Sequence, residues 1–368
     1  MHNLRSTQSL KNEETDAIPS IRYDIIVIGA SMGGFHALKQ LISEFPEDLP
    51  AAVFVVLHIP TDHKSFLAEA FGRDAKLPVL PAKDGDLIKP NHVYVAVPDF
   101  HLRIEGKHIS LDHGPKHNFH RPAVDTLFKS AAESFGPRVV GVVLTGALDD
   151  GTSGTMDIKR YGGMAVVQAP SDAANPSMPA SVIDCVDVDH CVPLSKMGKL
   201  LSSLAGQLVD ESFVRSRESI PKPSEPELST HICPECNGPM WLVETGKLLH
   251  FHCRIGHSFS GQSLLVEKTM ALESALWSAV NALKDKADIS IKLAKRMRKE
   301  TAAGLTADYF HNQATNSQFH AKVISDIILK ETSPAALTTT MPKRRKRPKL
   351  AKAHRPNRVK AKRSLSRS

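Results

Sequence analysis

Short apolar runs alternate with amphipathic segments along the first half of the chain. Buried-strand runs stand at residues 24–30 (DIIVIGA) and 52–57 (AVFVVL), and residues 33–45 and 64–73 have the spacing of amphipathic helices. This alternation is typical of α/β proteins, because a helix between two strands returns the chain for parallel pairing. The pattern therefore predicts a mostly parallel sheet that begins near Tyr23.

Residues 78–112 interrupt this alternation. Pro and Gly are frequent there, the apolar runs are short, and the segment around Glu105-Gly106 predicts a hairpin turn. We expect this section to be an antiparallel insertion. The α/β pattern then resumes with a helix at 122–135, a strand at 139–145, a helix after Asp150, a strand at 164–168 and a helix at 195–207.

The second half of the chain has a different pattern. A linker at 209–230, rich in Pro, Glu and Ser, precedes a Cys/His module (residues 231–260), and apolar residues then recur at helical intervals over 261–332. A helical hairpin is the simpler interpretation of 261–332, and a coiled coil that binds a partner is the alternative. Residues 1–22 and 333–368 lack pattern, so we expect a disordered leader and a disordered tail.

Composition narrows the class of protein. At 368 residues with 41% hydrophobic residues the chain exceeds what a single core usually organises. No run approaches the roughly 20 apolar residues of a membrane helix and no signal peptide begins the chain, so we expect a cytoplasmic protein. Five unevenly spaced cysteines indicate a reducing compartment.

The segment Gly29-Ala30-Ser31-Met32-Gly33 joins the first strand to the first helix and spells G-x-S-x-G. Small residues let the chain turn sharply here, so that the serine hydroxyl stands at the carboxyl edge of the sheet. Free N–H groups of the following helix can stabilise an oxyanion. A phosphate or dinucleotide cradle is the alternative for such a loop, although the G-x-G-x-x-G spacing is absent because position 31 is Ser.

Two more strand ends offer partners for a serine nucleophile. His58 follows the second strand directly, and Asp149 and Asp150 follow the strand at 139–145. A serine needs a base within hydrogen-bond reach, and an acid behind the base holds the imidazole and stabilises its charged form. The three strand ends together therefore predict a Ser-His-Asp hydrolase.

Seven motifs carry a resemblance to a known family, namely GASMGG, LHIP, PAKDGDLI, RPAVDTLF, VVGVVLTGALDDGTSG, IKRYGG and QAPSDAANPSMPASVI. In order and spacing they resemble the catalytic domain of CheB-type protein-glutamate methylesterases over about residues 23–205, and we expect that domain to span 23–208. The resemblance implies a doubly wound α/β fold and hydrolysis of glutamate methyl esters on chemoreceptor signalling helices. More weakly, it implies deamidation of receptor glutamines.

The same resemblance implies roles for individual residues. The family's serine, histidine and aspartate fall on Ser31, His58 and Asp150, and its oxyanion hole falls on the backbone N–H groups of Met32 and Ala147. The family more often has threonine and methionine at the last two positions, but main-chain donors survive such changes. No cofactor for catalysis is implied.

Regulation departs from the family pattern. Chemotaxis methylesterases usually carry a phosphorylatable receiver domain that links them to a phosphorelay, and we expect that the 22 residues before Tyr23 cannot encode one. The alternatives are a constitutive enzyme, control by a separate regulatory partner, or service in another signal transduction system.

The Cys/His module has the spacing of a metal site. Cys233 and Cys236 form a C-x2-C knuckle, and Cys253 and His257 supply a second pair. Three thiolates and one imidazole suit tetrahedral Zn²⁺, and four protein ligands leave no open position, so a structural role is expected. Reduced cysteines packed in a small hairpin are the alternative. The motifs CPEC and CRIGH also resemble extensions of receiver-less family members.

Two further features bear on partners and thiols. Residues 341–368 hold 13 of the 47 Lys and Arg residues and no acid, so the rest of the chain is mildly acidic. The tail could bind nucleic acid, an anionic membrane surface or an acidic receptor helix. Cys185 and Cys191 lie in an apolar segment, where buried structural thiols are expected.

An inactive signalling or binding module on the same fold is the second class of function that the sequence allows.

Overall fold

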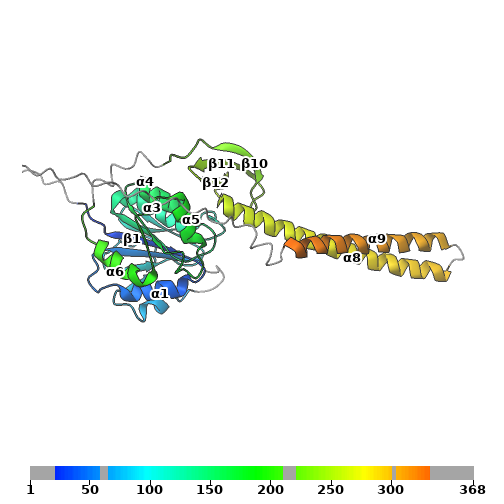
Figure 1. The fold of residues 1–368 in the computed structure, drawn as a ribbon, viewed down its shortest axis with the longest axis horizontal. Coiled ribbons are helices and arrows are strands. Elements are labelled where there is room, and N and C mark those ends of the chain that lie inside the picture. Colours follow the sequence, from blue (N-terminus) through cyan, green and yellow to red (C-terminus); the bar gives the residue numbers. More distant parts are fainter. Residues whose placement is uncertain (1–20, 59–64, 210–220, 301–303, 332–368) are drawn as a thin grey trace, which may run out of the picture. The chain divides into compact units, whose positions relative to one another are not determined.

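The computed structural model describes residues 21–58, 65–209, 221–300 and 304–331 (Figure 1). Of the predicted leader only Ile21 and Arg22 belong to these residues, and the whole of the predicted basic tail lies outside them. The chain divides into two compact units, Met1–Met270 and Ala271–Ser368. The first unit holds the predicted α/β domain together with the Cys/His module.

A seven-stranded parallel sheet forms the centre of the first unit. Its strand order is β3-β4-β2-β1-β7-β8-β9, and each neighbouring pair is parallel. The strands are β1 (Ile25–Ala30), β2 (Ala52–Leu57), β3 (Val79–Pro81), β4 (Val93–Val95), β7 (Val139–Val143), β8 (Met164–Gln168) and β9 (His190–Val192). β1 pairs with β2 on one side and with β7 on the other. The chain therefore adds later strands first on the β2 side of β1 and then on the β7 side, and this reversal of strand order lies next to β1. In open α/β sheets, ligands bind at the carboxyl ends of the strands beside such a reversal.

Helices cover both faces of the sheet, which confirms the doubly wound α/β fold (Figure 1). One face packs against α1 (Gly34–Glu44) and α6 (Leu194–Leu204). The other packs against α3 (Val124–Phe135), α4 (Thr152–Arg160) and α5 (Ser177–Cys185). Every residue of β1 and β2 is buried, which explains their continuous apolar runs. The short α2 (Leu67–Gly72) contacts β3.

The section at 78–112 is only half antiparallel. The predicted hairpin is confirmed as β5 (His101–Glu105) and β6 (His108–Asp112), which pair antiparallel around the turn at Gly106. The expectation was wrong for β3 and β4, since both join the main sheet in parallel. Their runs of three residues are too short to reveal pairing direction from sequence.

The segment at 177–192 also differs from expectation. It forms α5 and the edge strand β9, neither of which the sequence pattern predicted. Cys191 lies on β9 and is exposed, and Cys185 at the end of α5 is only half-buried. The prediction of buried thiols was therefore wrong for Cys191, because an edge strand presents alternate side chains to solvent.

The Cys/His module folds as a four-stranded antiparallel sheet that leads into the C-terminal helices. Its strands are β10 (Glu227–Ile232), β11 (Pro239–Thr245), β12 (Leu248–Cys253) and β13 (Ser258–Ser260), so the sheet begins inside the predicted linker. The helices are α8 (Gly261–Glu300) and α9 (Gly304–Glu331). Val280 packs with Ala321 and Ile328, as expected of a helical hairpin. Among the described helices, none combines the length and apolar character that a membrane span requires.

Candidate functional site

Ser31 stands in the tight turn between β1 and α1, at the carboxyl edge of the sheet. Its N–H donates to the carbonyl oxygen of Thr145 at 3.0 Å, which ties the turn to the end of β7. Gly33 has φ +78°, a conformation that side chains with a Cβ rarely adopt. A Cβ on Gly146 would lie 2.9 Å from the Ser31 Cβ, so glycine is required beside the serine as well. Small residues therefore leave room around the hydroxyl.

His58 follows β2, the strand beside β1, and lies between the other two predicted residues. Its Nδ1 lies 3.1 Å from the Ser31 Oγ, and its Nε2 lies 2.7 Å from the Asp150 Oδ2. The hydrogen-bond network assigns the tautomer in which Nε2–H donates to the carboxylate and Nδ1 accepts from the hydroxyl. The histidine and aspartate side chains are only 5% and 3% exposed. The structure thus brings Ser31, His58 and Asp150 into one hydrogen-bonded line.

The Asp150 carboxylate lies at the N-terminus of α3. It accepts hydrogen bonds from the N–H groups of Val124 at 2.7 Å and Asp125 at 3.1 Å, and from the side-chain amide of Asn118 at 3.3 Å. Burial by itself would raise the pKa of Asp150, but the hydrogen bond and charge of His58 and the backbone donor lower it below its ordinary value. Asp150 therefore remains an anion that can stabilise a protonated His58.

Asp149 points away from this line. Its Oδ1 accepts hydrogen bonds from the hydroxyls of Ser260 at 2.7 Å and Ser263 at 3.4 Å, both of which follow the metal-like motifs in the chain. Burial raises its pKa above the ordinary value. The two adjacent aspartates thus face different partners, and Asp150 alone of the two contacts His58.

Sequence reasoning missed His120, which covers one face of the His58 ring. The two imidazole rings stack with centroids 3.6 Å apart and planes 11° apart. Burial and the neighbouring His58 lower the pKa of His120 to about 4, so His120 is neutral near pH 7. A neutral ring here packs against His58 without adding charge repulsion.

The sequence also did not predict that Asp125 and Asn118 lie beside Asp150. The Asp125 carboxyl accepts from the N–H groups of Gly151 at 3.0 Å and Gly154 at 2.7 Å, and from the Asn118 amide at 3.2 Å. Burial and the charge of Asp150 raise the pKa of Asp125 well above its ordinary value. Asp125 belongs to the RPAVDTLF motif, which the resemblance includes without a role for its aspartate.

The predicted oxyanion donor Met32 follows Ser31 directly, and the second, Ala147, follows Gly146, whose Cα lies close to the Ser31 side chain. In the described part of the chain, neither the Met32 N–H nor the Ala147 N–H donates to a protein acceptor. The neighbouring N–H of Gly146 is already bonded to the carbonyl oxygen of Asn175 at 3.1 Å. Two uncommitted main-chain donors thus remain next to the serine, as an oxyanion would require.

The four predicted metal ligands form a separate cluster. The ligand atoms of Cys233, Cys236, Cys253 and His257 all lie within 4.8 Å of one another. The Cys236 and Cys253 sulfurs are 3.7 Å apart, and the His257 Nδ1 lies 3.4 Å from the Cys253 Sγ and 3.7 Å from the Cys233 Sγ. Zn–S and Zn–N bonds of about 2.3 and 2.0 Å in a tetrahedron place the ligand atoms roughly 3.5–3.8 Å apart. The cluster is therefore compatible with a tetrahedral metal ion.

Thiol acidity within the cluster is uneven. Burial raises the pKa of Cys233 to about 11. Burial would also raise the pKa of Cys253, but its hydrogen bonds, of which the one with His257 is the strongest, lower that pKa to about 7. A bound cation would favour the thiolate form of both cysteines, because metal ligation requires deprotonated sulfur.

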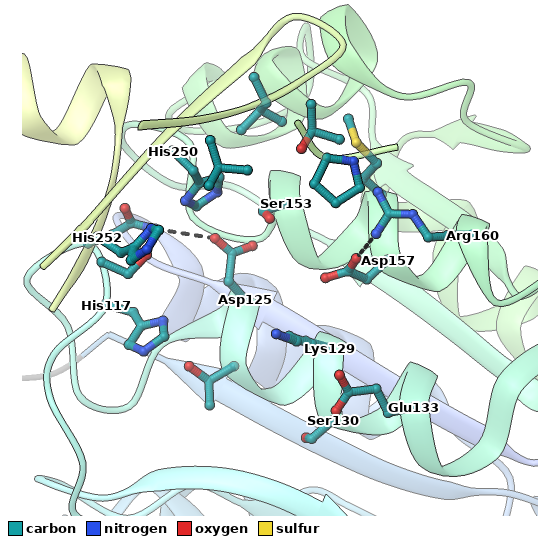
Figure 2. Close-up of a pocket in the computed structure, with 18 of the residues that line it drawn as sticks. His117, Asp125, Lys129, Ser130, Glu133, Ser153, Asp157, Arg160, His250 and His252 are labelled. Atoms are coloured by element: carbon teal, nitrogen blue, oxygen red, sulfur yellow. Dashed lines mark hydrogen bonds and ion pairs between the residues drawn. The ribbon is translucent and has the colours of Figure 1, made fainter. Parts of the chain in front are cut away.

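A cavity of about 700 Å³ is lined by residues of α3, α4 and β12, among others. Figure 2 shows Asp125 and Lys129 of α3 on one wall and His250 and His252 of β12 on another. Ser31 and His58 are not among the residues that line it. The cavity is therefore separate from the place where the serine could act, and sequence reasoning did not predict it.

Comparisons with known proteins indicate the family of this chain. Residues 26–201 match the family model described as CheB methylesterase. A Leptospira interrogans protein, provisionally named protein-glutamate methylesterase/protein-glutamine glutaminase, is 36% identical over 185 residues, which cover 50% of this chain and 96% of that protein. A Thermotoga maritima protein-glutamate methylesterase/protein-glutamine glutaminase is 35% identical over 190 residues, which cover 50% of this chain and 55% of that protein.

The crystal structure of the Thermotoga maritima CheB methylesterase catalytic domain has 36% sequence identity, a TM-score of 0.48, and coverage of 49% of this chain and 98% of that one. Several curated relatives extend well beyond the match, whereas nearly the whole Leptospira protein is matched. On the family model and this near-complete match to a relative, the chain belongs to the CheB methylesterase family.

Proposed function

We propose that the protein is a serine hydrolase that removes methyl esters from glutamate side chains of chemoreceptor-type signalling proteins. The observation that carries the proposal is the hydrogen-bonded line Ser31–His58–Asp150, with contacts of 3.1 and 2.7 Å at the carboxyl ends of three parallel strands. The names of the family relatives support the same chemistry.

In the proposed reaction, the Ser31 Oγ attacks the ester carbonyl carbon while His58 Nδ1 takes the hydroxyl proton. Asp150 stabilises the resulting imidazolium through Nε2–H. The Met32 and Ala147 N–H groups donate to the oxyanion of the tetrahedral intermediate. Methanol leaves with the proton from His58, and a water molecule then hydrolyses the acyl-enzyme by the reverse sequence of proton transfers.

Deamidation of glutamine follows the same route with ammonia as the leaving group. The protein-glutamine glutaminase part of the relatives' names supports it as a second activity of this site. The alternative, a weak or inactive signalling module on the same fold, is a distinct outcome of the test described below.

We further propose that Cys233, Cys236, Cys253 and His257 hold one structural Zn²⁺. Three ligand-atom pairs lie 3.4–3.7 Å apart and all four atoms lie within 4.8 Å of one another, which supports a tetrahedral site. Four protein ligands leave no position for a substrate. When bound, the ion would fix the two turns that carry its ligands, and it would take no part in ester hydrolysis.

A serine-directed fluorophosphonate probe tests the hydrolase proposal. Such a probe reacts with serines that a neighbouring base activates, so we expect peptide mass spectrometry to find the adduct on Ser31 and to find none in Ser31→Ala. A wild-type protein that resists the probe would favour the inactive-module alternative. An adduct that persists in Ser31→Ala would assign the nucleophile to another residue.

A further inference from the structure

The Cys/His module contacts the catalytic part of the chain directly behind the triad carboxylate. Ser260, the last residue of β13, donates its hydroxyl to the Asp149 Oδ1 at 2.7 Å and its N–H to the Asn118 Oδ1 at 2.8 Å. The adjoining Ser263 N–H donates to the Ser260 Oγ at 3.0 Å, which fixes the hydroxyl that Asp149 accepts. All of these groups are buried, so water does not compete for them.

Asn118 links β13 to the proposed triad through hydrogen bonds on both sides of its side-chain amide. Its amide Nδ2 donates to the Asp150 Oδ1 at 3.3 Å and to the Asp125 Oδ2 at 3.2 Å, while its Oδ1 accepts from β13. Its own N–H also donates to the Ser258 carbonyl oxygen at 2.8 Å. Asn118 is 3% exposed, and its φ of +49° is one that asparagine tolerates better than most residues. One side chain thus joins β13 to the carboxylate that faces His58.

The opposite end of β13 leads into the metal cluster. His257 immediately precedes β13, and Cys253 ends β12, the strand paired with it. The Cys253 N–H donates to the His257 carbonyl oxygen at 3.0 Å, and Gly256, with φ +106°, closes the turn between the two ligands. A metal ion held by both residues would therefore fix the position of β13.

We infer that the Cys/His module is a positioning element for the esterase, in which metal-held β13 sets Asp150 through Asn118 and Asp149. The inference rests on the proposed methylesterase function and on the proposed metal site. Ser260 and Asn118 are positioning residues, because they act on Asp150 and its neighbour and do not touch the substrate. Small displacements of an orienting group are costly to catalysis, since the imidazole must point at the hydroxyl when attack begins.

Ser260→Ala in the full chain removes the hydroxyl contact while leaving the β13 backbone in place. We expect kcat for methyl-ester hydrolysis to fall about tenfold with KM unchanged, as is typical when an outer partner of a functional group is lost. The matched control is Ser229→Ala on β10, the far edge strand of the same sheet, whose hydroxyl accepts from the His231 N–H at 3.1 Å. The control also loses one hydroxyl hydrogen bond, but far from Asp149 and Asn118, and it is expected to retain full kcat.

Two further measurements separate this inference from the proposed function. Hydrogen exchange of the Val124 and Asp125 amides, which donate to Asp150, should accelerate in Ser260→Ala and in chelator-treated wild type, whether or not the protein is active. Chelation should lower kcat of the wild type at least tenfold and that of Ser260→Ala by a smaller factor, because both changes act through the same contact.

The inference would be overturned if the wild type is active and neither Ser260→Ala nor metal removal changes kcat or the exchange of these two amides. A wild type that shows neither hydrolysis nor labelling of Ser31 would instead overturn the proposed function. In that case the exchange data still decide whether β13 positions Asp150.

Discussion

The parallel sheet and the Cys/His module stabilise their folds in different ways. The sheet buries large apolar clusters on both faces, with Phe54 and Ile28 fully buried on opposite sides. The module has a single small cluster, and two of its six buried members are the predicted metal ligands Cys233 and Cys253. Apolar burial at about 25 cal/mol per Å² can hold the sheet, whereas a cluster this small would gain much of its stability from the proposed metal ion.

The two regions also differ in what they contribute to the proposed active site. The sheet places Ser31, His58 and Asp150 at strand ends that its own core fixes. The module adds no group to that line and meets it only through Ser260 and Asn118. The sheet thus carries the proposed reaction, and the role that we propose for the module is to position one of its groups.

The largest expected effect is on the module, through metal removal. Purified protein should contain about one Zn²⁺ per chain, and Cys236→Ala should lower that content. Structural zinc sites contribute roughly 10–16 kcal/mol in isolated zinc-finger peptides, so chelation should unfold residues 231–257 and leave the sheet protected from hydrogen exchange. The control is Cys191→Ala, which removes an exposed thiol on β9 and should keep its zinc. Absence of zinc from protein prepared without chelators would contradict the comparison.

The next largest effect distinguishes the two adjacent aspartates. Asp150→Asn leaves Ser31 and His58 in place but removes the charge that stabilises the imidazolium, so it should lower the hydrolysis rate on the order of 10⁴-fold. Asp149→Asn should cost far less, because its Oδ1 can still accept from Ser260. Steady-state kinetics of the two variants check the ranking, and a reversed order would move the catalytic acid to position 149.

A core substitution tests whether the sheet is independent of the metal. Phe54→Ala on β2 should reduce the free energy of unfolding by about 3–5 kcal/mol, because a fully buried ring is lost and a cavity remains. Urea unfolding gives this change, and metal analysis of the folded protein should find the zinc content unaltered. The control Phe66→Ala removes a 65% exposed ring and should change stability by less than about 0.5 kcal/mol. Loss of zinc in Phe54→Ala would mean that the two regions fold as one.

The smallest effect is a pH dependence at the module. Burial lowers the pKa of His250 from 6.5 to about 4, so the unfolded chain binds its proton first as the pH falls. Stability should therefore decrease between about pH 6.5 and pH 4, by up to roughly 3 kcal/mol from this group. His250→Gln should reduce the difference between urea midpoints at pH 7.5 and pH 5, whereas the exposed control His36→Gln should not. Equal pH dependence in wild type and His250→Gln would rule out this contribution.

Sequence predicted the features that local pattern determines. β2 and β8 begin and end where predicted, because buried parallel strands appear as continuous apolar runs. The rule that parallel strands end at one edge of a sheet predicted that Ser31 and His58 would meet one acid of the Asp149-Asp150 pair, and the family resemblance selected Asp150. The triplets β3 and β4 were too short for their pairing to be predicted.

The residues that sequence missed acquire their roles through distant contacts. Asn118 bonds to Ser260 across 142 positions, and Asp149 bonds to the same serine across 111. His120 matters because its ring stacks on His58, and no periodicity in the chain indicates that approach. Such roles depend on tertiary packing, which composition and spacing do not encode.

Methanol release from a methylated chemoreceptor, compared between wild type and Ser31→Ala, tests the central claim most directly. We expect that the wild type releases methanol and that the variant loses about 10³–10⁶-fold in rate, while its fold and its zinc content remain unchanged. A wild type that releases no methanol, or a Ser31→Ala variant that releases it at the wild-type rate, would contradict the account.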